Sequence, residues 1–70
     1  MRKPTVEFVH SGDYVAEVPV TLIEGEGDWT PRLSLDDARK LEAVRLALKR
    51  GDVAAASKHG RVFALMALPA

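Results

Sequence analysis

The side chains best suited to chemistry in this 70-residue chain lie in the short stretch His10-Ser11-Gly12-Asp13. A histidine, a hydroxyl and a carboxylate are the components of a nucleophilic relay, in which a base activates the hydroxyl and an acid orients the base. Residues of one tight turn cannot adopt that geometry, and glycine and aspartate are typical of turns. The stretch therefore predicts a turn, and the sequence predicts a protein that is not an enzyme.

A second group of reactive side chains occupies the acidic segment Glu24-Gly25-Glu26-Gly27-Asp28. Its alternating carboxylates resemble part of a calcium loop, but such a loop needs more oxygen ligands and a closing bidentate glutamate. Cysteine is absent, and the two histidines, His10 and His59, are far apart in sequence. We therefore expect no metal site and no cofactor. The carboxylates remain candidates for contact with a basic partner.

Charge is divided unevenly along the chain, although 10 basic and 10 acidic residues give no net charge. Residues 1–35 carry 3 basic and 6 acidic side chains, a balance of −3, and residues 36–70 carry 7 and 4, a balance of +3. This asymmetry suits an oriented contact with a charged partner or with a second copy, or it only solvates two surfaces. The basic half also allows an alternative function in binding nucleic acid, through Arg39, Arg45, Lys49 and Arg50.

Two strands are predicted before the acidic segment, over Thr5–His10 and Tyr14–Glu24. The second strand alternates, and its uniformly apolar side should face the core: Tyr14, Ala16, Val18, Val20 and Leu22. Val15 and Ile23 then lie on the other side, together with Val9 of the first strand. Pro19 cannot donate a backbone hydrogen bond, so it predicts that the second strand lies at a sheet edge or bends there.

A helix is predicted from Ser34, as N-cap, to Arg50, with Gly51 as its left-handed cap. Its apolar residues form two stripes on nearly opposite sides. One stripe, with Leu41, Val44 and Leu48, is sufficient to cover a sheet. The other contains Leu35 and Leu46, and it can pack on a following short helix, Val53–Lys58, or on another molecule.

The chain closes with a predicted strand, Arg61–Leu68, that is apolar on both faces and therefore expected inside the sheet. The order is strand, strand, helix, helix, strand. This order predicts an α+β fold in one domain, residues 1–70, with a three-stranded antiparallel or mixed sheet and both helices on one face.

The size of the chain bears on its state of association. A chain of 70 residues buries only about 60% of the surface its unfolded form exposes, so we expect a homo-oligomer or a permanent partner. No segment is apolar and long enough for a signal peptide or a membrane span, which predicts a cytoplasmic protein without membrane contact. Nothing in the sequence indicates a small-molecule substrate.

Two stretches carry a resemblance to a known family. Gly12-Asp13-Tyr14-Val15-Ala16-Glu17-Val18-Pro19 and the helix start Leu33-Ser34-Leu35-Asp36-Asp37-Ala38 resemble a strand and a helix start of HicB-like antitoxins, although the Pro-Gly-Cys turn usual after that strand is missing. Over its full length the chain is similar to a group of short bacterial proteins of unassigned function, which share a Trp-Ser/Thr-Pro element and an Arg-Val-Phe/Tyr-x-Leu ending. The resemblance implies an antitoxin-like protein that binds a toxin or a copy of itself.

The predicted function is thus that of a non-enzymatic protein-interaction module. Trp29 either anchors the acidic loop or joins the contact surface. The residues predicted to contact a partner are Val15, Ile23, Glu24, Glu26, Asp28, Trp29, Leu35 and Leu46.

Overall fold

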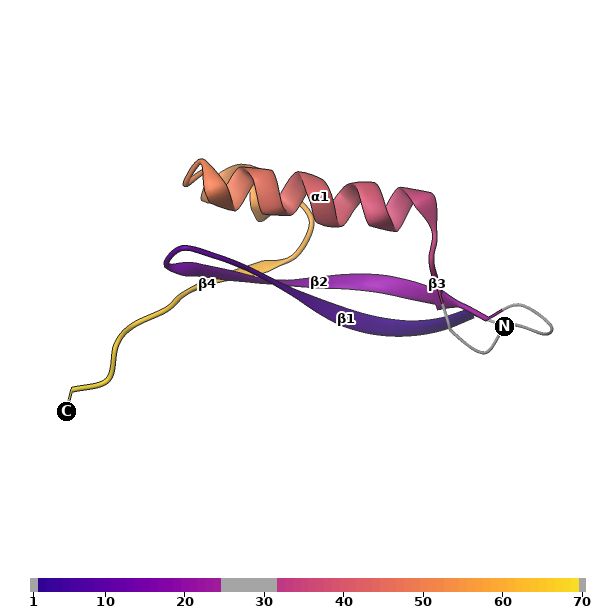
Figure 1. Ribbon diagram of the computed structural model, residues 1–70, viewed down its shortest axis with the longest axis horizontal. Coiled ribbons are helices and arrows are strands. Elements are labelled where there is room, and N and C mark those ends of the chain that lie inside the picture. Colours follow the sequence, from indigo (N-terminus) through magenta and orange to yellow (C-terminus); the bar gives the residue numbers. More distant parts are fainter. Residues whose placement is uncertain (1, 25–31, 70) are drawn as a thin grey trace.

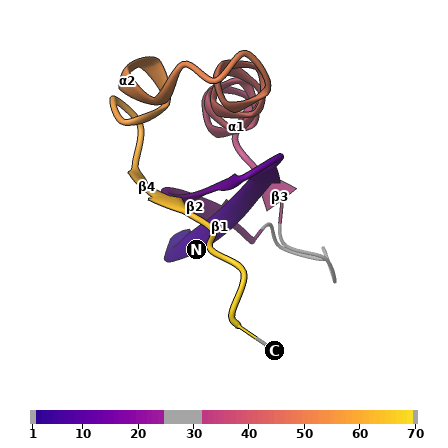
Figure 2. The ribbon, with the colours of Figure 1, turned by 90° about the vertical axis from the view of Figure 1, so that its left-hand side faces the viewer.

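The computed structural model describes residues 2–24 and 32–69. Its elements are β1 (Arg2–Ser11), β2 (Tyr14–Ile23), β3 (Arg32–Leu33), α1 (Leu35–Lys49), α2 (Val53–Ala56) and β4 (Arg61–Ala64). The strands form one four-stranded antiparallel sheet, and both helices lie on the same face of it (Figure 1 and Figure 2). The predicted α+β fold is confirmed, with β3 as an additional strand of two residues that was not predicted.

β1 and β2 form a hairpin that is paired along its whole length, from Arg2 opposite Ile23 to Ser11 opposite Tyr14. The two-residue loop has a positive φ at Gly12 (+58°) and not at Asp13, the pattern of a type II′ turn. His10 Nε2 donates to the Gly12 carbonyl oxygen at 3.0 Å. The predicted turn is therefore confirmed, and the histidine of the stretch hydrogen-bonds within it.

Both ends of α1 are fixed by the residues that predicted them. Ser34 Oγ accepts the Asp37 backbone N–H at 3.1 Å. At the other end the Asp52 N–H donates to the Ala47 carbonyl (2.8 Å) and the Gly51 N–H to that of Leu48 (3.0 Å), with Gly51 at φ +75°. These two bonds make a Schellman motif, which turns the chain sharply into α2. That helix ends at Ala56, two residues before the predicted end at Lys58.

The core lies between the sheet and the two helices. The predicted inner face of β2 is confirmed, because its central residues are buried and Tyr14 packs against them. The stripe of α1 that contains Leu41, Val44 and Leu48 covers this face, as predicted. The buried side chains of the described residues are all alanine, valine or leucine: Ala16, Val18, Val20, Val44, Ala47, Leu48 and Ala56. This core is small, and none of the aromatic rings in the described part of the chain is fully buried in it.

Pro19 lies in the middle of the sheet, so the predicted edge strand is wrong for β2 as a whole. β1 pairs with one edge of β2, whereas β4 and β3 pair with the two ends of its other edge, at Tyr14–Glu17 and Leu22–Ile23. The residues between them, 18–21, have no strand partner on that edge among the described strands. Pro19 is therefore tolerated because its missing N–H falls in a local gap, where no ladder bond is lost.

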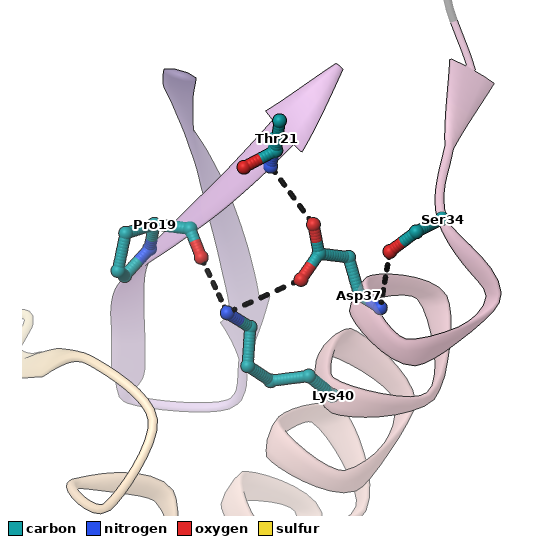
Figure 3. A network of polar contacts seen from close by, with 5 residues as sticks. All are labelled: Pro19, Thr21, Ser34, Asp37 and Lys40. Carbon is teal, nitrogen blue, oxygen red and sulfur yellow. Dashed lines mark hydrogen bonds and ion pairs between the residues drawn. The ribbon is translucent and has the colours of Figure 1, made fainter. Parts of the chain in front are cut away.

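Side chains of α1 close this gap in place of a strand (Figure 3). Asp37 Oδ2 accepts the Thr21 N–H at 2.8 Å, and Lys40 Nζ donates to the Pro19 carbonyl oxygen at 2.6 Å. The two side chains also pair with each other, with Lys40 Nζ 3.4 Å from Asp37 Oδ1. The helix is thus bound to the backbone of β2, and the exposed length of strand edge is satisfied locally.

β4 differs from its prediction in both length and position. It pairs with β2 at one end of the sheet and stops at Ala64, four residues before the predicted end at Leu68. The Leu65 N–H still donates to the Asp13 carbonyl at 2.7 Å, but the β1–β2 hairpin turns at that point. None of the described strands extends past this point, and residues 66–69 run away from the sheet (Figure 1).

Candidate interaction surface

The sheet face opposite the helices is the main candidate for function. Since Ala16, Val18 and Val20 point into the core, the alternate residues of β2 point away from it. Residues opposite each other in an antiparallel pair share a face, so the register assigns the neighbours on β1 and β4. We define the outer face by the residues that this rule assigns: Arg2, Pro4, Val6, Phe8, His10, Val15, Glu17, Pro19, Thr21, Ile23, Arg32, Arg61 and Phe63.

Large apolar side chains are exposed on this outer face. Phe8 exposes 66% of its surface, Val6 42% and Phe63 40%. An antiparallel sheet with one solvated face normally alternates between apolar residues inside and polar residues outside. Here the two phenylalanines of the chain both lie outside. An exposed apolar surface of this kind is typical of a contact site.

Charged groups of both signs lie among these apolar residues. Glu17 is opposite Phe8 on one side and Arg61 on the other. The Arg61 guanidinium carbon lies 5.4 Å from the centroid of the Phe63 ring, within the range of a cation–π contact. The outer face therefore combines aromatic rings with one acidic side chain, Glu17, and three basic ones, Arg61 and, opposite Ile23, Arg2 and Arg32.

The structure confirms part of the predicted outer face and corrects the rest. Val15 and Ile23 lie on it, and so does part of the last strand, through Phe63. Val9 does not, because it is opposite the buried Ala16 and packs against the core. Phe8 takes its place. The two-residue loop pairs Ser11 with Tyr14, so counting back from the turn could have placed Phe8 opposite Glu17.

Leu35 and Leu46 of the second helix stripe are also exposed, at 66% and 41%. α2 packs beside α1 without covering them. They lie in the helix layer, whereas Val15 and Ile23 lie on the far side of the sheet. The structure thus separates the predicted contact residues into two surfaces, and among residues 2–24 and 32–69 the aromatic rings Phe8 and Phe63 belong to the outer face.

The acidic part of the predicted surface falls largely outside the described residues. Glu26, Asp28 and Trp29 belong to residues 25–31, of which the structure gives no description. Glu24 directly follows β2 and is exposed.

The basic residues of the nucleic-acid alternative fall within an arc of about 140° around α1, at about 100° per residue, but Leu35, Glu42 and Leu46 lie within the same arc and interrupt them. Arg45 Nε donates to Glu42 Oε2 at 3.0 Å; this side-chain hydrogen bonding lowers the pKa of Glu42 and raises that of Arg45. Arg50 forms an ion pair with Asp52, with 3.8 Å between Nη2 and Oδ2. Arg39 and Lys49 are exposed, but at about 100° per residue they point in directions roughly 80° apart. These four cations therefore make no continuous basic surface.

An open hollow of about 300 Å³ lies near the start of α1. Asp37 on its wall has a lowered pKa, chiefly because its carboxylate accepts the Thr21 N–H and also because Lys40 is close. Within residues 2–24 and 32–69, no three histidine or acidic side chains gather in a way that could hold a metal ion. The hollow is lined by Arg2, Thr21, Ile23, Ser34, Asp36 and Asp37.

Comparisons with known proteins do not assign a function to either surface. Neither a protein-family model, nor a curated protein, nor a solved structure matches the chain. No helix in the described part of the chain is long and apolar enough to cross a membrane. The resemblance to HicB-like antitoxins stays a prediction, and the outer face has to be interpreted from its own geometry.

Proposed function

We propose that this chain is a non-enzymatic protein-interaction module whose contact surface is the outer face. The exposure of Phe8, Phe63 and Val6 on a face that the chain itself leaves uncovered supports this proposal. Aromatic side chains bury a large area at little cost in conformational entropy, and they are enriched at the centres of interfaces. A surface of this type serves binding, and its mixed charges select the partner.

The proposed class of partner follows from charge and from the resemblance. The negative charge that can select a partner lies in the acidic segment directly after β2, which carries Glu24, Glu26 and Asp28, because Glu17 is the one carboxylate that the strand register assigns to the outer face. A basic protein is the complementary partner. Together with the resemblance to HicB-like antitoxins, this charge favours an antitoxin-like function in which the chain covers a basic toxin.

The proposal is tested by mixing the purified chain with the product of the neighbouring gene, at low and at high salt. We expect a complex that weakens as salt rises, because exposed charges more than about 10 Å apart are screened near 0.1 M ionic strength. In the cell, coexpression of the chain should relieve growth inhibition by that product. Only salt-insensitive self-association, without any complex, would contradict the antitoxin function.

Two variants locate the contact. Phe8→Glu introduces a charge on the outer face and should weaken the complex, whereas Leu35→Glu makes the same change on α1, at a side chain of equal exposure. A complex that loses affinity with Leu35→Glu and keeps it with Phe8→Glu would contradict the assignment of the contact to the outer face.

A further inference from the structure

We propose that a second copy of this chain occupies the outer face, and that the segment 65–69 of each copy lies across the outer face of the other. This inference rests on the proposed function and identifies one partner of the same surface. Because both partners use the outer face, self-association and binding of the basic partner exclude each other. Three observations support it: the exposed area of the single chain, the charges of the outer face, and the course of the terminal segment.

The single chain exposes more surface than a compact protein of its mass. Its accessible area is 5425 Å², against about 4,300 Å² for a folded monomer of 7.6 kDa. The Cα radius of gyration, 14.1 Å, likewise exceeds the value of about 11 Å for a compact chain of this length. The excess of about 1,100 Å² is comparable with the roughly 800 Å² that each partner buries in a stable interface.

The part of the outer face around Glu17 and Arg61 is complementary to itself in charge. A two-fold axis brings the same surface patch of both copies together. If residue i of one copy contacts residue j of the other, then residue j of the first also contacts residue i of the second. Glu17 and Arg61 are neighbours on this face and have opposite signs. Two such faces can therefore pair the Glu17 carboxylate of one copy with the Arg61 guanidinium of the other, in duplicate. The net charge of zero imposes no overall repulsion.

The terminal segment leaves the sheet on the side of the outer face (Figure 1 and Figure 2). Met66 and Leu68 expose 87% and 90% of their surface, and Leu65 is also exposed. Because the β1–β2 hairpin turns at Asp13, these apolar residues have run past the end of their own sheet. A second copy packed on the outer face would offer them its Phe8 and Val6.

The alternative, in which two copies join their β1 strands edge to edge, is disfavoured by Pro4. Thr21 directs its N–H, and Pro19 its carbonyl, away from β1 and toward α1. Their partners on β1, Pro4 and Val6, accordingly direct their backbone groups to the free edge. A proline at this edge removes a donor that an added strand would need. The second copy therefore covers the face instead of extending the sheet.

Light scattering or sedimentation of the intact protein from about 1 to 300 µM tests the proposal. We expect the mass to rise with concentration from 7.6 kDa toward twice that value for the unmodified chain and for the control Leu35→Glu, and to stay at 7.6 kDa for Phe8→Glu. Deletion of residues 66–70, which keeps the Leu65 hydrogen bond, should raise the dissociation constant by about tenfold or more, because the apolar area of Met66 and Leu68 is lost from the contact. Circular dichroism checks that each variant is folded.

A mass of 7.6 kDa throughout for the unmodified chain would overturn the proposal, and so would a Phe8→Glu variant that associates normally. A deletion variant with unchanged affinity would overturn the role of the terminal segment. These failures are distinct from failure of the proposed function. That function would fail if the chain formed a complex with another protein and Phe8→Glu left the affinity of the complex unchanged.

Discussion

The two faces of the sheet differ in the size of the side chains they carry. The inner face has Ala16, Val18 and Val20, whose small side chains let α1 and α2 pack close to the strands. The outer face has Phe8 and Phe63, which remain uncovered. The two phenylalanines of the sheet thus lie outside the core of the single chain. The comparison assigns folding to the inner face, and our proposal assigns association to the outer face.

The first prediction compares the same substitution on the two faces. Val18→Glu places a carboxylate where the native side chain is fully buried, at a cost of several kcal/mol. A domain of this size has only about 3–5 kcal/mol of stability, so the variant should be unfolded at 25 °C. Phe8→Glu should keep a folded far-UV circular dichroism spectrum. A cooperative thermal transition in Val18→Glu, or an unfolded Phe8→Glu, would contradict the division between the faces.

The second prediction concerns the close approach that holds β4 and its preceding turn against β2. A Cβ at Gly60 would overlap the carbonyl oxygen of Glu17, which belongs to the backbone and cannot rotate away. Gly60→Ala should therefore lower the free energy of unfolding by about 3 kcal/mol, measured by urea titration. In the control Gly51→Ala the Cβ meets no atom, and the positive φ alone should cost about 1 kcal/mol. Equal losses would contradict the close approach at Gly60.

The third prediction uses the pH dependence of stability to distinguish the hydrogen bond from the Thr21 N–H to Asp37 from the surface ion pair between Glu42 and Arg45. The pKa of Asp37 is lowered by the Thr21 N–H and by Lys40. Folding therefore favours its charged form, and the stabilisation is present above a pH of about 4 and is lost as the pH falls through the lowered pKa. Asp37→Asn should make the unfolding free energy less dependent on pH in this acid range. The control Glu42→Gln should have a smaller effect that 0.5 M salt largely removes, since its partner Arg45 is exposed. An Asp37→Asn profile as steep as that of the unmodified chain would contradict the role given to Asp37.

Local features of the sequence were sufficient to predict those helices and strands whose ends depend on neighbouring residues. Ser34 and Gly51 fixed α1 because caps act within one turn, and Gly12 fixed the hairpin because a two-residue loop requires a positive φ. The inner face of β2 followed from its strict alternation. These are the parts of the fold that composition and spacing determine directly.

Features that depend on distant parts of the chain were not predictable in this way. The end of β4 depends on where the β1–β2 hairpin turns, and the tolerance of Pro19 depends on the gap between β4 and β3. For the outer face, alternation identified Val15 and Ile23, but Phe8 was missed because the register between β1 and β2 was not applied. Phe63 lay in a strand with apolar residues on both faces, where alternation cannot choose between them.

Chemical shifts of backbone amides, recorded at increasing protein concentration, test the central claim most directly. If the outer face is the contact surface, the shifts of Val6, Phe8, Val15, Phe63 and Met66 should move together with concentration, while those of Leu35 and Leu46 stay fixed. Movement confined to Leu35 and Leu46, or no movement up to about 1 mM, would contradict association through the outer face.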